Sequence, residues 1–98
     1  VSVAADDYGS GNVYVIDGVQ KKSLTFEAGT TYTINHPSGH PLRFSETEDG
    51  THGSGTEYTV GVDTSVAGTT TIQVTSDTPS TIYYYCSAHP GMGGPATQ

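Results

Sequence analysis

The chain has 98 residues and a formal net charge of −7, which comes from ten carboxylates against three basic side chains. This length predicts a single domain that spans residues 1–98. An acidic surface repels nucleic acid and anionic membranes and attracts basic proteins, so we expect no nucleic-acid partner. No apolar run approaches the roughly 20 residues that cross a bilayer, so we expect no membrane insertion.

The composition favours strands over helices. Thirteen glycines and many threonines and tyrosines accompany few helix-forming residues at helical spacing. In chain order, the predicted strands are 1–3, 12–17, 23–27, 31–35, 41–45, 58–62, 69–75 and 81–86. Turns are predicted at 6–11, 63–68 and 77–80, a long acidic loop at 46–57, and a frayed tail or brief closing strand after residue 94. About seven or eight short strands predict an all-β fold, an antiparallel β-sandwich or barrel.

The strand predicted at 81–86 leads into the most informative stretch of the chain. Alternation with a period of two puts Ile82, Tyr84 and Cys86 on one face, so Cys86 points inward like a core isoleucine. His89 and Met92 follow at spacings of three, and the chain has no other cysteine or methionine. A buried cysteine alone is more often a core residue. A thiolate, an imidazole and a thioether this close together, with a second histidine, instead favour a copper ion that carries one electron.

The second histidine is predicted to be His40. The segment 36–41 contains two prolines, which bias the residues before them to extended backbone, so it reads as a loop that delivers His40 to the strand 41–45. His36 remains the competing ligand, although its place before Pro37 favours a position beside the site. His52 lies in the acidic loop and is predicted to be a solvated histidine.

The single cysteine excludes an internal disulfide. A lone thiol persists in an oxidising compartment when burial or a metal protects it. Residues 1–5 lack the basic lead and apolar centre of a signal peptide. Removal of such a peptide upstream, or an origin as a segment of a longer protein, both stay open.

Other kinds of site fit the sequence less well. Structural zinc prefers several cysteines, and catalytic zinc prefers harder ligands with an open position. A hydrolase based on Cys86 is not expected, because its own strand would mask the thiol and the chain has no nucleophile elbow. No glycine-rich phosphate loop follows a strand and opens a helix.

Three stretches together resemble the cupredoxins, the small blue-copper proteins. The segment 24–32 resembles the second hairpin of the family, and Gly39–Phe44 resembles the segment that supplies its first histidine ligand. The segment Tyr85–Met92 resembles the C-terminal ligand loop, in the short form of the amicyanin-like branch rather than the longer plastocyanin or azurin form.

The resemblance implies a Greek-key fold and a type 1 copper centre that shuttles between Cu(II) and Cu(I). His40, Cys86 and His89 would be the equatorial ligands and Met92 the axial ligand. It further implies a monomeric electron carrier rather than an enzyme, with a redox protein, basic in charge, as partner. The expected location is extracytoplasmic, whether periplasmic, lumenal or secreted.

Two positions depart from the family pattern, and other functions stay open. Pro41 stands where the family often has asparagine, so proline must supply the rigidity of that loop. Gly39 precedes His40 as in azurin, where a carbonyl also approaches the metal. A copper storage or delivery protein, or a structural module of a larger extracytoplasmic protein, is the main alternative. A small copper redox enzyme would need an open coordination position, which Met92 closes.

Overall fold

The computed structural model describes residues 2–5, 12–37, 39–89 and 91–98, so the turn predicted at 6–11 lies outside the described residues. Within them the chain forms strands and one short 3-10 helix and no α-helix, which confirms the all-β prediction. The elements are β1 (Ser2–Ala5), β2 (Asn12–Ile16), β3 (Val19–Gln20), β4 (Leu24–Thr25), β5 (Thr31–Asn35), β6 (Leu42–Ser45), η1 (Gly50–Gly53), β7 (Glu57–Tyr58), β8 (Val62–Val66), β9 (Thr69–Gln73), β10 (Thr81–Cys86) and β11 (Pro95–Thr97).

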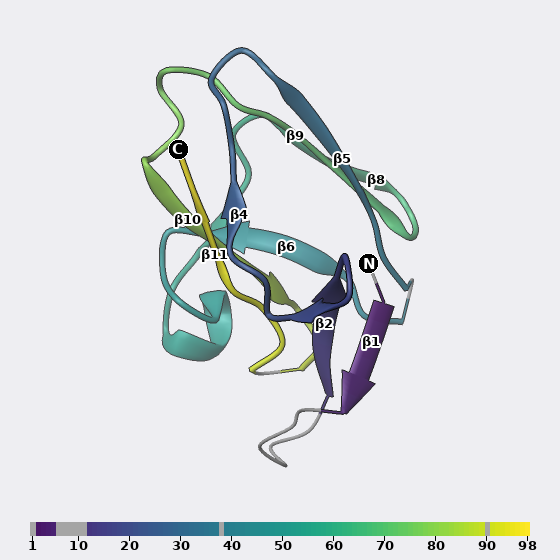
Figure 1. The fold of residues 1–98 in the computed structure, drawn as a ribbon. Coiled ribbons are helices and arrows are strands. Elements are labelled where there is room, and N and C mark those ends of the chain that lie inside the picture. The colour runs from purple at the N-terminus through teal and green to yellow at the C-terminus, as the bar shows by residue number, and fades with distance from the viewer. Residues whose placement is uncertain (1, 6–11, 38, 90) are drawn as a thin grey trace.

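The strands form three sheets that pack around one core (Figure 1). The largest sheet has the order β4-β11-β10-β6-β7, a second has the order β5-β9-β8, and a third has the order β1-β2-β3. Antiparallel pairing of β10 with β6 lies at the centre of the largest sheet, with Cys86 opposite Leu42 and Tyr84 opposite Phe44. These sheets remain open, so the molecule is a sandwich-like assembly and not a closed barrel.

The structure departs from the predicted strand pattern in several respects. The two-residue strand β3 was not predicted, because so short a pairing leaves no periodic pattern to read, and the described strands number eleven. The strand predicted at 23–27 is shortened to β4, and the single strand predicted at 58–62 is wrong, because residues 59–61 form a turn between β7 and β8. The segment predicted as a turn at 63–68 is mostly strand β8. The tail forms a closing strand, β11, which pairs parallel to β4 although only antiparallel pairs were expected.

The core lies between the largest sheet and the β5-β9-β8 sheet. It is built from inward side chains of these strands, from Tyr14 on β2 and from residues that follow strands, and burial of each large apolar side chain contributes about 1.5–3 kcal/mol. Its buried members are Tyr14, Phe26, Leu42, Phe44, Ile72, Val74, Ile82, Tyr84, Cys86, Met92 and Ala96. Cys86 and Met92 therefore lie in the core, at the end of the molecule where β10 stops.

The opposite face of β10 is also partly covered. Tyr85 points away from Tyr84 but is only 1% exposed, because η1 lies over its ring. Gly50 in η1 makes this contact possible, since a Cβ at that position would reach 2.5 Å from the ring. The loop predicted at 46–57 is thus a packed element beside the end of β10.

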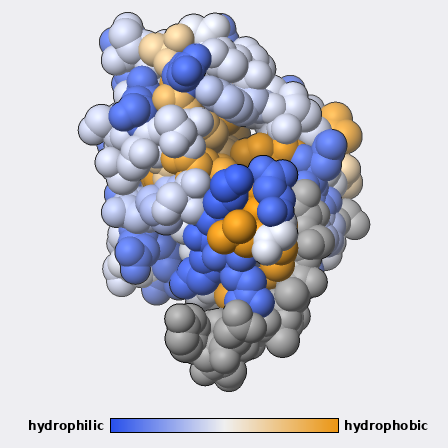
Figure 2. All heavy atoms as spheres, in the orientation of Figure 1, coloured by the Kyte–Doolittle hydropathy of each residue, from blue (hydrophilic) through white to orange (hydrophobic). Residues whose placement is uncertain are grey.

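Exposed apolar side chains are few and scattered. On the face shown in Figure 2, hydrophobic groups reach the surface in small patches separated by hydrophilic ones. Large exposed hydrophobic residues among those described are Val19, Val60 and Val66. In the described part of the chain, no helix has the length and apolar character that crossing a membrane requires.

Candidate metal centre

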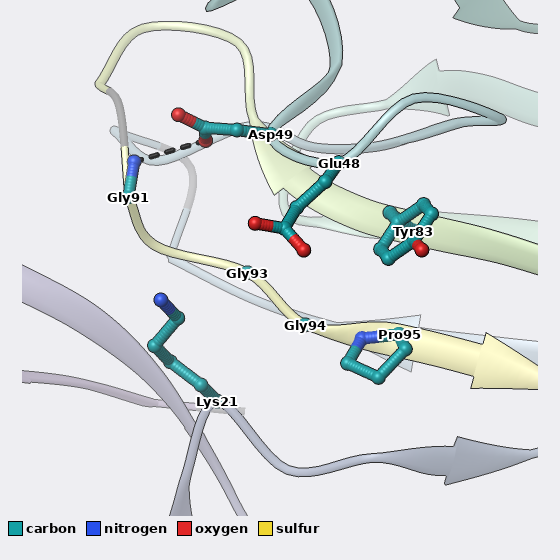
Figure 3. A pocket seen from close by; sticks show the side chains of 8 residues that line it. All are labelled: Lys21, Glu48, Asp49, Tyr83, Gly91, Gly93, Gly94 and Pro95. Carbon is teal, nitrogen blue, oxygen red and sulfur yellow. Dashed lines mark hydrogen bonds between the residues drawn. The ribbon is translucent and has the colours of Figure 1, made fainter. Parts of the chain in front are cut away.

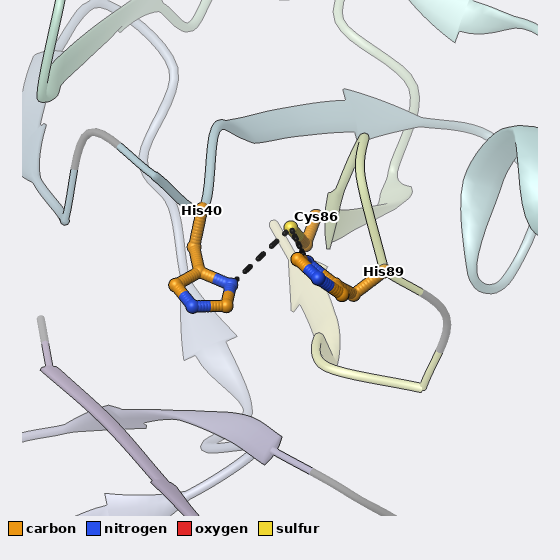
Figure 4. Close-up of side chains that lie close together, drawn as sticks. All are labelled: His40, Cys86 and His89. Atoms are coloured by element: carbon orange, nitrogen blue, oxygen red, sulfur yellow. Dashed lines mark hydrogen bonds between the residues drawn. The ribbon is translucent and has the colours of Figure 1, made fainter.

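Three of the four predicted ligands converge at one end of the sandwich. The side chains of His40, Cys86 and His89 each offer one ligand atom, and these atoms all lie within 4.8 Å of one another. The Cys86 Sγ atom is 3.9 Å from His40 Nδ1 and 3.7 Å from His89 Nδ1. Figure 4 shows both imidazole rings directed toward the sulfur. Such a group can hold a metal ion.

Sheet pairing explains why residues 46 positions apart meet. His40 ends the loop that precedes β6, and Cys86 is the last residue of β10. Because β6 and β10 are antiparallel neighbours in register at Leu42 and Cys86, the start of one strand lies beside the end of the other. The loop prediction is confirmed for residues 36, 37 and 39–41, which the structure describes, and the His40 N–H donates to the Pro37 carbonyl at 3.1 Å.

The three donors differ in their access to solvent. Cys86 is fully buried, His40 is partly buried, and His89 is exposed. The imidazole rings of His40 and His89 lie 4.8 Å apart between centroids, at an angle of 41°. The site is therefore closed around the sulfur and open at one histidine.

Met92, the fourth predicted ligand, lies near this group. Its side chain is fully buried and belongs to the same core cluster as Cys86. A flexible thioether in this position can serve either as packing or as a weak fourth donor.

Backbone hydrogen bonds join the two ligand loops. The Ser87 N–H donates to the Pro41 carbonyl at 3.0 Å, directly between the residue after His40 and the residue after Cys86. Pro41 thus accepts the cross-loop bond through its carbonyl, which any residue could supply, while its ring restricts the backbone.

The segment 46–57 holds the C-terminal ligand loop from the other side. The carboxylate Oδ1 atom of Asp49 accepts the Gly91 N–H at 2.9 Å. His52 Nε2 lies 2.8 Å from the Cys86 carbonyl oxygen, which can only accept, so the Nε2–H of the imidazole donates to this candidate ligand residue. Figure 3 shows the Asp49 contact together with Lys21 and Glu48. These residues line a groove with a volume of about 250 Å³. His52 is exposed as predicted, but it supports the site as well as facing solvent.

His36 lies apart from the group of ligands. Its ring is buried, with Nε2 at 3.0 Å from Thr70 Oγ1 and Nδ1 at 2.9 Å from the Pro37 carbonyl. The Thr70 hydroxyl in turn donates to the Leu42 carbonyl at 2.8 Å. This histidine therefore links β9 to the loop before β6, and His40 is the histidine that reaches Cys86.

Tyr14 and His52 contact candidate ligand residues, Asp49 contacts Gly91 in the loop between His89 and Met92, and sequence reasoning assigned none of the three to the site. The Tyr14 hydroxyl donates to the His40 carbonyl at 2.6 Å, from a distance of 26 residues along the chain. Asp49 and His52 contact residues 42 and 34 positions away. No local spacing signals such contacts, because tertiary folding alone brings the partners together.

Comparison of the chain with protein-family models, with curated proteins and with solved structures finds no match. The case for a function therefore depends on the residues of the site and their geometry.

Proposed function

We propose that the chain is a cupredoxin-like electron carrier with one type 1 copper centre. The observation that carries the proposal is the convergence of two imidazoles and one buried thiolate donor, with a thioether nearby. Two histidines, a cysteine and a weak axial methionine are the donor set of copper sites that transfer single electrons.

The donor set favours copper over zinc. A structural zinc site takes four strong ligands, usually with several cysteines, and a catalytic zinc site keeps a position open for water. Here a single thiolate is paired with two imidazoles, and the remaining donor is a thioether, which is a weak and soft ligand. Copper, when bound, supplies the chemistry by alternating between Cu(II) and Cu(I).

The protein's part in this proposal is to hold its donors still. Cys86 is fixed at the end of β10 by its pairing with Leu42, and His40 is fixed by the turn from Pro37. The cross-loop bond from Ser87 to Pro41 joins the two. A site whose ligands move little between oxidation states transfers electrons with a smaller reorganisation barrier.

His89 is the proposed point of electron entry and exit, since it is the exposed ligand. Exposed Glu46 and Glu48 lie on the neighbouring loop and would attract a basic redox partner. Replacing both by lysine should lower the rate of transfer to a cationic acceptor and weaken its salt dependence, measured by stopped-flow absorption. An unchanged salt dependence would remove the steering role.

A copper titration tests the proposal. Apoprotein given Cu(II) should develop a strong thiolate-to-copper absorption band with one copper per chain, and voltammetry should show a reversible one-electron wave. The band should be absent in Cys86→Ser and lost in His40→Ala. It should be retained in His36→Ala, which serves as the matched control because that imidazole bonds Thr70 instead of joining the ligands.

Other outcomes would support a different function. Tight Cu(I) binding with sluggish cycling would favour copper storage or delivery. A site that binds only zinc, or a band that survives in Cys86→Ser, would contradict the proposal. We further propose that the protein is a monomer, that it works outside the cytoplasm, and that it is not an enzyme, since Met92 would close the coordination position that a substrate needs.

A further inference from the structure

Tyr14 on β2 contacts both loops that carry the ligands. Its backbone N–H donates to the Met92 carbonyl at 2.9 Å. Its hydroxyl donates to the His40 carbonyl at 2.6 Å. Strand β2 supplies no candidate ligand. Tyr14 nevertheless forms hydrogen bonds with the backbone carbonyls of two candidate ligands, His40 and Met92, which lie on opposite sides of Cys86 in the sequence.

The position of the Tyr14 ring is fixed by the core. The side chain is fully buried, and its ring packs against that of Tyr84 with centroids 6.2 Å apart and an angle of 47°. Burial raises the pKa of the Tyr14 hydroxyl far above its ordinary value, and the adjacent Cys86 side chain raises it further.

We propose that Tyr14 is a positioning residue of the metal centre, whose hydroxyl holds the backbone of His40 so that its imidazole faces Cys86. This inference rests on the proposed copper function. The bond acts on the ligand residue itself, one peptide unit from the bond between Pro41 and Ser87. Together the two bonds restrain His40 from the β2 side and from the side of the C-terminal loop.

Tyr84 provides a matched control within the same core. It is equally buried, and its hydroxyl also donates to a backbone carbonyl, that of Lys22, at 2.7 Å. Removal of either hydroxyl deletes one buried hydrogen bond of the same kind. The two variants differ in that only the partner of Tyr14 is a ligand residue.

The test compares Tyr14→Phe with Tyr84→Phe. Both should lose stability to urea to a similar extent. Only Tyr14→Phe should also shift the thiolate-to-copper band and release copper to a chelator about five-fold faster, as expected for the loss of one hydrogen bond. In the apoproteins, hydrogen exchange of the His40 and Ser87 backbone amides should be faster in Tyr14→Phe alone.

The outcomes separate this inference from the proposed function. If the parent protein forms no copper band, the function fails, and the apoprotein exchange rates still decide whether Tyr14 restrains His40. If the parent binds copper and Tyr14→Phe matches Tyr84→Phe in band position, release rate and exchange, the inference is overturned.

Should Tyr14→Phe not fold, 3-fluorotyrosine placed at position 14 retains the hydroxyl and alters its donor strength. 3-Fluorotyrosine at position 14 should shift the thiolate-to-copper band, whereas the same substitution at position 84 should not. A band that does not shift with the substitution at position 14 overturns the inference.

Discussion

Met92 can be altered without large damage to packing, which allows its role as a ligand to be separated from its role in the core. Leucine has nearly the same volume, so Met92→Leu should cost less than about 1.5 kcal/mol of stability. If the thioether is a weak axial donor, its loss should raise the reduction potential, because Cu(I) accepts lower coordination more readily than Cu(II). Voltammetry of the copper-loaded protein measures this shift.

The control for Met92 is an equally buried apolar residue away from the ligands. Ile82 lies on the same face of β10 as Cys86, and its side chain is 1% exposed. Ile82→Val should lower stability by about 0.5–1.5 kcal/mol and leave the potential unchanged. A potential that is the same in Met92→Leu and in the parent would mean that Met92 only fills space.

At the scale of residues, the sequence predicts ligands better than it predicts their supports. Cys86 and His89 lie within four residues, so their spacing is visible without a fold. His40 could be chosen over His36 from its place before a strand, and the structure agrees. Tyr14 looked like an ordinary residue of a buried strand, because its contact with His40 depends on where β2 packs and leaves no local pattern.

At the scale of elements, the segment between Cys86 and β11 must pass close to β10. The Tyr84 N–H donates to the Gly94 carbonyl at 3.0 Å, so the chain returns along its own preceding strand. Gly93 makes this approach possible, because a Cβ there would overlap the Tyr84 carbonyl and crowd the Tyr85 backbone. The ligand loop is therefore short and closed tightly at its base.

Gly93→Ala should destabilise the protein by about 2 kcal/mol or more, because two backbones must move apart. Gly39→Ala is the comparison, since a Cβ at Gly39 meets no atom within 4 Å, and the change should stay within about 0.5 kcal/mol. Urea unfolding of the two apoproteins measures the difference. Equal midpoints would show that the 86–94 segment relaxes freely.

Element boundaries show what local sequence patterns omit. The predicted strands at 31–35 and 81–86 coincide with β5 and β10. Exposed and partly buried side chains alternate along β5, and most side chains of β10 are buried. The segment at 63–68 contains Asp, Ser and Gly, which favour turns, yet most of it is strand β8. A register irregularity between Asp63 and Val66, with Asp63 Oδ1 accepting both Ser65 N–H and hydroxyl, places turn-like chemistry inside a paired strand.

At the scale of the whole molecule, the centre lies where separate parts of the fold come together. The candidate ligands come from the loop before β6, from the end of β10 and from the loop after β10. β2 supplies Tyr14, and the loop with η1 supplies Asp49 and His52. The all-β class follows from composition, but this arrangement does not, because the order of the three sheets depends on pairings between distant strands. Copper release and folding stability are therefore expected to change together when these contacts are altered.

Buried tyrosines should set the alkaline limit of the fold. Burial raises the pKa of Tyr14, Tyr84 and Tyr85 above the ordinary value near 10, so they stay protonated in the folded state when the unfolded chain ionises. Their stabilisation is complete below about pH 10 and declines as pH rises further, by up to about 1.4 kcal/mol per pH unit for each such tyrosine.

Urea midpoints from pH 8 to 11.5 test this in the Cys86→Ser apoprotein, where no thiol ionises. The midpoint should fall above about pH 10. Adding Tyr84→Phe should make the fall less steep, and a midpoint that stays constant to pH 11.5 would show that these hydroxyls ionise as readily in the folded protein as in the unfolded chain.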